Sequence, residues 1–440
     1  MEKTLKKSGK YAWLILFFLA LSSYAAIGTV STSFSNNLPY LMDELGITNA
    51  QSSMLLSIKT AAQVITMLLC IPILQKISAR IMITIGLLVT AIGCFIFTFA
   101  TSYSTCCVAV FLLGVSYGWS GMTTLSTIAR NWFVKHRALS LGILTAATGV
   151  AGTINPQVIL FLIRTGGINL NFTVTGIFFV VCGVLIFLFV RDQPQDLGYM
   201  PLGAENVSAV AVEGDDVQLE EKSKYAPTIL CHVLMLIFIC CLGGFNYAAW
   251  SHFAQLYDAA GWSDTDVANL MSIASFLLII TKIAFGLISD KFSAQKTAWI
   301  FFGCCFISML MSWQLAGVKN YFLQILNFAI YSIGGVLGTT GISVYGIDMS
   351  NRKTYKTINS IYVPAYSVGG MIVSPFMGEI ADMTGGYGPG YAILAVLCVV
   401  GYICTMIAYK LAENNRKKLD AAQKAWCIQY ASTNHRIYKK

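Results

Sequence analysis

Residues 265–291 read TDVANLMSIASFLLIITKIAFGLISDK, and this stretch decides what kind of protein the chain forms. A run of about 20 predominantly apolar residues is what a helix needs to cross the hydrocarbon core of a bilayer. One cation, Lys282, interrupts the run at a depth where a charge costs several kcal/mol. An ionisable residue at membrane depth indicates a functional site, so the stretch predicts a membrane span and a candidate binding residue.

Apolar runs of similar length lie on both sides of this stretch. The chain has 440 residues, of which 56% are hydrophobic and only 11% charged, and its mean hydropathy is +0.67. A soluble domain of this size carries more polar surface. The predicted fold class is therefore all-α, a polytopic membrane protein with twelve transmembrane helices in two six-helix bundles. The predicted spans are 11–34, 50–74, 81–101, 104–128, 139–163, 172–190, 227–250, 265–289, 297–317, 319–345, 357–380 and 389–410.

A polar stretch divides the twelve spans into two sets of six. It contains prolines, glycines and the acidic group Glu213, Asp215 and Asp216, a composition typical of a flexible linker. We expect four parts of the chain, which are an N-terminal bundle, a cytoplasmic linker, a C-terminal bundle and a cytoplasmic tail. They cover residues 1–190, 191–226, 227–410 and 411–440.

The distribution of positive charge predicts the topology. Nearly all of the 29 lysines and arginines fall in segments that share one side of the membrane if both termini are cytoplasmic. Only Arg164 and Lys319 fall in loops on the other side. Cytoplasmic loops carry an excess of Lys and Arg, so we expect a multi-pass protein of the cytoplasmic (inner) membrane with both termini inside. The net charge of +9 then faces anionic lipid and does not indicate nucleic-acid binding.

Signals for cofactors or catalysis are weak. Nearly all of the 13 cysteines lie inside spans, and no C-x-x-C or Cys/His spacing typical of a metal site occurs. The four histidines lie at loops or span ends, and none is spaced from a serine or cysteine in a known catalytic pattern. We expect no metal, no cofactor and no enzymatic activity.

The two halves carry a similar loop at the same place. Residues 74–80 read LQKISAR after the second span, and residues 289–296 read SDKFSAQK after the eighth. Both contain Lys, an apolar residue, Ser and Ala, followed by a cation, in the turn between the second and third helices of a half. The repeat at one topological position favours a parallel duplication of six spans.

These features resemble the major facilitator superfamily across residues 11–410. Gly286-x-x-Ser289-Asp290-Lys291 is similar to the loop motif with which that superfamily braces its cytoplasmic gate. In the first copy Pro72 and Gln75 replace the glycine and the acid. The resemblance implies the major facilitator fold, a gating role for Gly286, Asp290 and Lys291, and a seam between the halves formed by spans 2, 5, 8 and 11.

A narrower resemblance is carried by the loop before the fifth span. Residues 132–142, WFVKHRALSLG, are similar to a signature of the monocarboxylate transporters and the oxalate/formate antiporters, which adds Lys135 and Arg137 to the gating candidates. Residues 190–198, VRDQPQDLG, resemble the exit from the sixth span in those families. Lys282 stands where those families place an arginine that binds the substrate carboxylate.

Polar side chains inside the spans supply the candidate substrate-binding residues. Lys59 and Lys282 lie in spans 2 and 8, so a paired cationic site between the halves predicts a small anionic ligand. Either lysine has an alternative, which is to extend its ammonium to the nearer interface. Each tyrosine or asparagine has the alternative of an interhelical hydrogen bond. The full set of substrate candidates is Lys282, Lys59, Tyr362, Tyr366, Asn359, Gln63, Asn155, Asn246 and Tyr24.

The sequence predicts a secondary active or exchange transporter of small organic anions, in particular carboxylates, that works by alternating access. Proton-coupled relatives place a membrane acid four residues before the substrate-binding cation, and Leu278 occupies that place here, which favours anion exchange. An efflux carrier for amphipathic organic acids or drug-like compounds is the alternative, and a transporter-like receptor is a third. We expect a monomer whose partners are the substrate and the lipid bilayer.

Overall fold

The computed structural model describes residues 6–7, 9–134, 136–203, 225–291, 294–338, 341–350 and 354–437, and nearly all of them are helical. Ten helices in these ranges are long and apolar enough to cross a membrane. One of them, α7 (Arg137–Phe189), contains two spans, because Gly166 and Gly167 break helical geometry in its middle. The 30-residue helix α15 (Tyr355–Thr384) adds a further span. The predicted all-α fold of twelve transmembrane helices is confirmed.

The N-terminal half begins with a short strand, β1 (Lys6–Lys7), which pairs in parallel with β2 (Tyr199–Met200) beyond the last helix of this half. The helices of this half are α1 (Gly9–Ser23), η1 (Tyr24–Thr32), η2 (Phe34–Asn37), α2 (Leu38–Leu45), α3 (Asn49–Leu74), α4 (Ala79–Thr98), α5 (Tyr103–Trp119), α6 (Met122–Trp132) and α7, followed by η3 (Pro194–Leu197).

The C-terminal half repeats this order of long helices. Its helices are α9 (Ile229–Leu242), η6 (Gly243–Tyr247), α10 (Ala248–Ala259), α11 (Asp264–Lys291), α12 (Ala294–Gln314), α13 (Tyr321–Gly335), η7 (Val336–Gly338), α14 (Gly341–Asp348), α15 and α16 (Gly388–Ile437).

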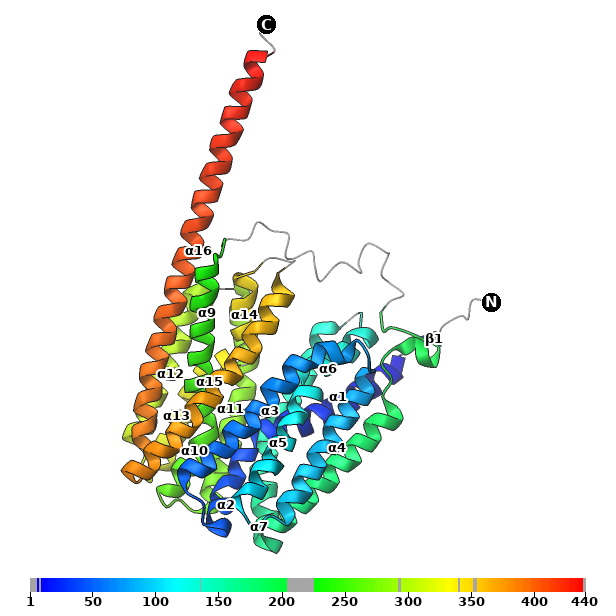
Figure 1. Ribbon diagram of the computed structural model, residues 1–440, viewed down its shortest axis with the longest axis vertical. Coiled ribbons are helices and arrows are strands. Elements are labelled where there is room, and N and C mark those ends of the chain that lie inside the picture. The colour runs from blue at the N-terminus through cyan, green and yellow to red at the C-terminus, as the bar shows by residue number, and fades with distance from the viewer. Residues whose placement is uncertain are drawn as a thin grey trace.

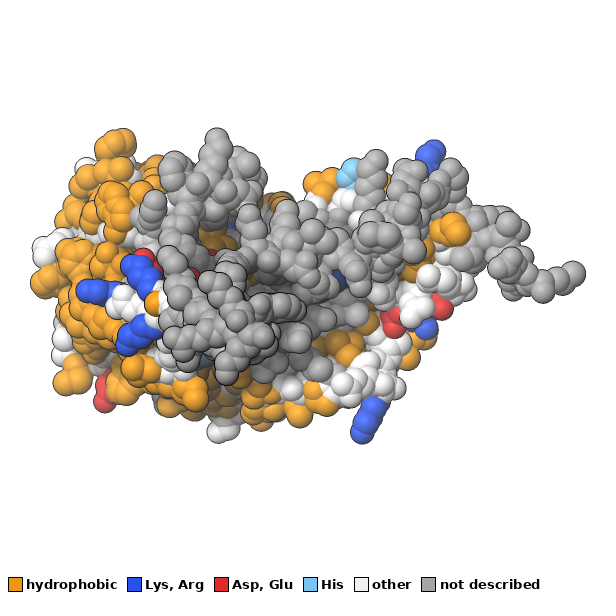
Figure 2. Space-filling model, turned by 90° about the horizontal axis from the view of Figure 1, so that it is seen from above, with side chains coloured by type: hydrophobic (Ala, Val, Ile, Leu, Met, Phe, Trp, Pro, Cys, Tyr) orange, Lys and Arg blue, Asp and Glu red, His pale blue; other side chains and the backbone are white. Residues whose placement is uncertain are grey.

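Each half has a hydrophobic core of its own. One cluster of buried apolar residues is drawn from the N-terminal half and the other from the C-terminal half, and they share no residue. The halves meet where α3 packs on α15 and where α7 packs on α11, the seam that the family resemblance implied. Both termini lie at one end of the molecule, here named the terminal end (Figure 1). Hydrophobic side chains cover much of the rim seen from that end, as expected of a surface that faces lipid (Figure 2).

The first long helix of each half is interrupted by a π-helical segment. In the N-terminal half the segment is η1, and in the C-terminal half it is η6. Both segments contain glycines, and π-helical turns occur frequently at functional sites because they reorient the side chains that follow. The two interruptions occupy equivalent places in the two halves, and both border the space between them.

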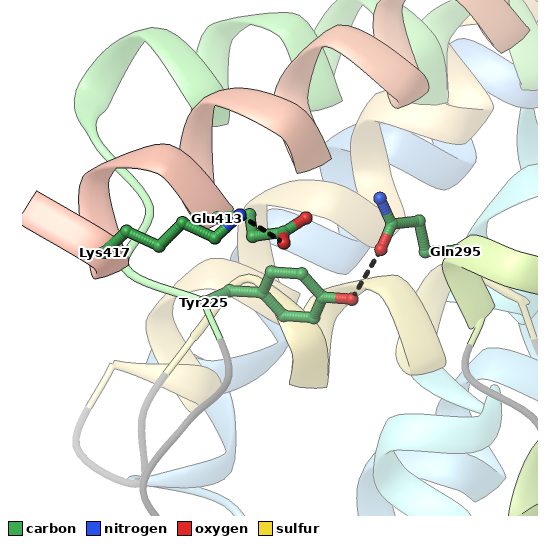
Figure 3. A network of polar contacts seen from close by, with 4 residues as sticks. All are labelled: Tyr225, Gln295, Glu413 and Lys417. Carbon is green, nitrogen blue, oxygen red and sulfur yellow. Dashed lines mark hydrogen bonds and ion pairs between the residues drawn. The ribbon is translucent and has the colours of Figure 1, made fainter.

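The chain re-enters the C-terminal half at the terminal end. There the Tyr225 hydroxyl donates to Oε1 of Gln295 at 2.9 Å, and the amide of Ala226 donates to the carbonyl of Ala412 at 3.1 Å. The Glu413–Lys417 ion pair, at 3.0 Å, lies beside this contact on α16 (Figure 3). The Ala226 contact holds the chain before α9 against α16, and the Tyr225 contact holds it against α12. Helix α16 continues beyond the bundle (Figure 1).

Candidate substrate site

A cavity lies between the two halves and is lined from both of them. Its volume is about 140 Å³, room for on the order of ten water-sized groups. Residues from η1, α3, α5 and α7 form one wall, and residues from η6, α10, α11, α13, η7 and α15 form the other. The lining consists of Ile27, Ser31, Thr32, Gln63, Tyr117, Thr148, Asn246, Tyr247, Trp250, Leu278, Lys282, Tyr331, Gly335, Gly338 and Tyr366.

Lys282 is the only charged residue in this lining. Its side chain is half-buried, and among the residues that the structure describes it makes no hydrogen bond or ion pair. Leu278, one helical turn earlier on α11, lines the same cavity and brings no acid to it. A charge in so apolar a setting is stabilised by a partner of opposite sign, and the described residues do not supply one here.

The wall beside Lys282 presents an ordered group of polar atoms. The Tyr366 hydroxyl donates to Oδ1 of Asn246 at 3.1 Å, and the Tyr331 hydroxyl donates to the Asn246 carbonyl at 2.9 Å. Gly338 permits this arrangement, since a Cβ there would lie 2.6 Å from both Asn246 Oδ1 and the Tyr366 hydroxyl. The Nδ2 group of Asn246 is buried and lies against the Cys305 thiol behind the cavity wall. The Asn246 side chain is therefore fixed in orientation, and Asn246 holds the hydroxyls of Tyr366 and Tyr331 at the cavity wall.

The opposite wall is polar but more weakly so. Nε2 of Gln63 donates to the Ser367 hydroxyl at 3.4 Å, and Nε1 of Trp250 donates to the Thr32 carbonyl at 3.0 Å across the two halves. Tyr117 and Thr148 complete this wall. The structure therefore brings four of the predicted substrate residues together around one cavity, namely Lys282, Gln63, Asn246 and Tyr366.

Lys59 lies elsewhere. Its ammonium donates to the Val30 carbonyl at 3.0 Å and lies 5.0 Å from the ring centre of Phe34, and only 1% of the residue is exposed. Val30 belongs to the π-helical segment η1, and π turns depart from the regular hydrogen-bond pattern of an α-helix. The second lysine is thus held inside the N-terminal half and does not line the central cavity.

Tyr24 and Asn155 line a different cavity, inside the N-terminal half. The Tyr24 hydroxyl donates to Oδ1 of Asn155 at 2.6 Å, and Nδ2 of Asn155 donates to Thr29 and Ser33 at 3.0 and 3.3 Å. This cavity has a volume of about 190 Å³ and includes Phe178 and other aromatic side chains. Both predicted residues therefore make interhelical hydrogen bonds, and neither lines the central cavity.

The remaining predicted residues lie outside the cavity lining or outside the described residues. Tyr362 is buried, and its hydroxyl lies 2.9 Å from Nδ1 of His232 near the start of α9. Lys135 is outside the described residues, and so are the side chains of a further set of predicted residues. That set is Asn359, Arg137, Gly286, Asp290 and Lys291.

The loop after α3 carries the first copy of the gating motif, in which Gln75 stands in place of the acid. In the structure, an acid from another part of the chain binds this loop. Asp192, three residues after α7 ends, accepts hydrogen bonds from the amides of Ala79 and Arg80 at 2.8 Å each and so caps the N-terminus of α4. Nε1 of Trp132 donates to the Arg191 carbonyl at 2.7 Å beside it. The carboxylate that Gln75 cannot provide thus comes from the other end of the half.

The end of the molecule opposite the terminal end, here named the opposite end, is sealed by contacts between the halves. One face of α3 carries a row of residues that bond across the seam. Asp382 of α15 accepts from the amides of Asn49 and Ala50 and from the Asn49 side chain, at 2.8 to 3.0 Å. The row continues through the pairs Ser53–His252, Ser57–Met371, Thr60–Tyr247 and Gln63–Ser367. Between described residues, no hydrogen bond joins the halves on the terminal side of Gln63, so the seal closes one end only.

Several cavity residues carried no strong sequence signal. Ile27, Ser31 and Thr32 reach the cavity because η1 is π-helical, and hydropathy does not report such turns. The sequence signal for these segments was the glycines themselves. In the structure, a Cβ on Gly28 would lie 2.2 Å from Cβ of Ala151, and a Cβ on Gly243 would lie 1.8 Å from the Tyr366 carbonyl oxygen. Both glycines mark where the interrupted helices approach their neighbours closely.

The sequence of residues 13–374 matches the family model of the Major Facilitator Superfamily, and the chain belongs to this superfamily. It is accordingly a multi-pass membrane transporter rather than an enzyme.

Relatives of known name are distant. The chain is 20% identical over 409 residues to rat monocarboxylate transporter 13, covering 91% of this chain and 90% of the relative. It is 22% identical over 426 residues to the glycerol-3-phosphate transporter of Bacillus subtilis (strain 168), covering 91% and 93%.

Solved structures share the fold. The nucleoside transporter NupG aligns with a TM-score of 0.68 at 12% identity, covering 90% of this chain and 100% of that chain. A bacterial homologue of the human lysosomal transporter Spinster, in an inward-facing and occupied conformation, aligns with a TM-score of 0.64 at 15% identity, covering 92% and 98%.

Proposed function

We propose that this protein carries small organic anions, in particular carboxylates, by alternating access, and that Lys282 binds the anionic group. The observation that carries the proposal is the position of Lys282, the single charged residue in a cavity between two helical bundles, with no partner among the described residues. We further propose that the terminal end is cytoplasmic, in a cytoplasmic membrane, so that the sealed opposite end faces outside.

An anion completes this site chemically. A carboxylate beside Lys282 supplies a counter-charge that the described residues do not, and the ammonium donates charge-assisted hydrogen bonds to it. The surrounding tyrosines and Trp250 exclude water, which strengthens both interactions. A neutral substrate would leave the ammonium uncompensated.

The size and charge of the cavity narrow the substrate. About 140 Å³ suits a molecule of roughly ten non-hydrogen atoms and is small for an amphipathic, drug-like compound. One cation balances one negative charge, and Lys59 is engaged with Val30. Of two anion types named by the relatives, a monocarboxylate therefore fits this charge better than a doubly charged phosphate ester.

The proposal is tested by uptake of radiolabelled monocarboxylates into liposomes that contain the purified protein. Lys282→Gln should lower uptake by more than about 100-fold, because a buried charge left without its partner costs about 3–5 kcal/mol. Lys282→Arg should retain part of the uptake. The matched control is Lys59→Met, a neutral substitution at the other lysine of the spans, which should keep uptake per folded protein. Normal uptake by Lys282→Gln would refute the assignment.

A further inference from the structure

The seal at the opposite end contains a buried histidine that the substrate site does not use. His252 of α10 is 0% exposed and lies between the halves. Its Nδ1 atom is 2.7 Å from the Ala248 carbonyl, and its Nε2 atom is 3.0 Å from the Ser53 hydroxyl of α3. A carbonyl only accepts, so Nδ1 carries the proton and Nε2 of the neutral ring accepts from Ser53.

The ring has no counter-charge within reach. The Tyr387 ring centre is 5.4 Å away, and the carboxylates of the neighbouring elements form no ion pair with His252 among the described residues. The packing is also tight, because a Cβ on Gly378 would lie 2.3 Å from the Ser53 hydroxyl oxygen. Several titratable groups lie at this end on α10 and on the elements packed against it. They are Tyr40, Asp43 and Glu44 of α2, Tyr257 and Asp258 of α10 itself, Asp264 and Asp266 of α11, Glu379 and Asp382 of α15, Tyr387 before α16 and Tyr391 of α16.

An imidazolium in the closed seal would therefore be a buried charge without a partner, which is strongly unfavourable. Opening the seal separates α3 from α10 and exposes the ring to water and to an acidic rim. That rim carries Asp264, Asp258 and Asp43 beside Tyr40. Burial, together with these carboxylates and against the opposing effect of Arg164, raises the pKa of Tyr40 to about 12. A proton then binds the open form in preference to the closed form, and by linkage it shifts the population toward the open form.

We propose that His252 is a proton-binding site in the outer seal, through which external acidification opens the carrier to the outside. The inference uses the orientation proposed above and goes beyond anion transport. It makes the outward-open state a function of external pH between about 7.5 and 5.5, the range in which histidine changes charge.

One further carboxyl at this end changes charge in this range, because burial together with the carboxylates of Asp43 and Asp264 raises the pKa of Asp258 to about 6. Its protonation is favoured where it is buried, so it stabilises the closed form and does not produce the opening.

Asp382, which bonds across the seal, does not change in this range. Burial alone would raise the pKa of Asp382, but hydrogen bonds from the Ala50 amide and from the side chain and amide of Asn49 hold it below its usual value. The stabilisation that Asp382 gives is complete above the ordinary carboxyl range and is lost only as the pH falls through that lowered value. It therefore persists at pH 5.5.

The test measures the opening itself. Spin labels are placed on Phe99→Cys and Met383→Cys, two positions that are each 80% exposed, in a full-length variant whose native cysteines are replaced. The distance between the labels is measured by pulsed electron paramagnetic resonance. Lowering the pH from 7.5 to 5.5 should raise the population with long distances by at least about threefold, because a solvent-exposed histidine becomes mostly protonated over this range. In His252→Gln the long-distance population should not rise as the pH falls.

Two further variants keep the outcome decisive. His232→Gln, which removes a histidine near the terminal end, should leave the pH response intact. Ser53→Ala keeps the imidazole but removes its donor, so the seal should be more open at both pH values and still respond to pH. No response in the parent, or an equal response in His252→Gln, would overturn the proposal. The readout needs no substrate, so it stands apart from failure of the anion assignment.

Discussion

Two lysines of the same type, both in membrane spans, have opposite environments. Lys282 has no partner among the described residues and lines the central cavity, whereas Lys59 is bonded to Val30 and packed against Phe34. The sequence supplied both as candidates because each interrupts an apolar run. The sequence did not show that their roles differ, because the carbonyl that binds Lys59 belongs to a π-helical turn, and no residue pattern predicts such a turn.

Replacement of Lys59 should therefore affect stability rather than recognition. Lys59→Met leaves the Val30 carbonyl buried without a donor, a loss of about 1–3 kcal/mol. We expect a lower melting temperature for the purified protein. The rise in melting temperature produced by monoanions and by dianions should match the rise in the parent. Selective loss of the dianion effect would place Lys59 at the ligand.

At the scale of the element, hydropathy predicted every long helix but not how their ends are held. The acid that caps α4 comes from Asp192, more than a hundred residues away in the chain, so the degenerate motif at Gln75 gave no indication of it. The row of residues on α3 that bond across the seam was only partly predictable from the sequence. Its polar residues share one face, but their partners on α10 and α15 depend on how the halves meet.

The capping of α4 leads to a prediction with an internal control. Asp192→Asn keeps the shape of the side chain and removes its charge from a helix N-terminus, which should cost about 0.5–2 kcal/mol. The melting temperature should fall accordingly. Gln75→Ala, in the same loop, removes no cap and should change it little. Equal effects of the two substitutions would contradict the role given to Asp192.

At the scale of the whole molecule, the fold and its family were predictable because apolar runs of span length leave few alternatives. The two separate cores and the seam of α3, α7, α11 and α15 agree with that prediction. The conformation was not predictable, because sealing one end is a choice between states of nearly equal energy that one sequence must support.

The coupling of transport belongs to this scale. No acid lines the cavity in the described part of the chain, and Leu278 borders Lys282, which supports exchange of anions. Uptake into liposomes should rise several-fold when the lumen contains a counter-anion and should persist when an ionophore collapses the pH gradient. Uptake that vanishes with the gradient and ignores internal anion would establish proton symport instead.

The lone cation of the cavity has an electrical consequence. An empty cavity carries one positive charge, and a cavity filled by a monoanion carries none, so membrane voltage acts on the unloaded carrier alone. Moving one charge through the full field is worth about 2.3 kcal/mol per 100 mV. An inside-negative voltage therefore holds empty carriers with Lys282 facing inward. The return of the empty carrier becomes the voltage-sensitive step, while exchange of one monoanion for another passes no net current.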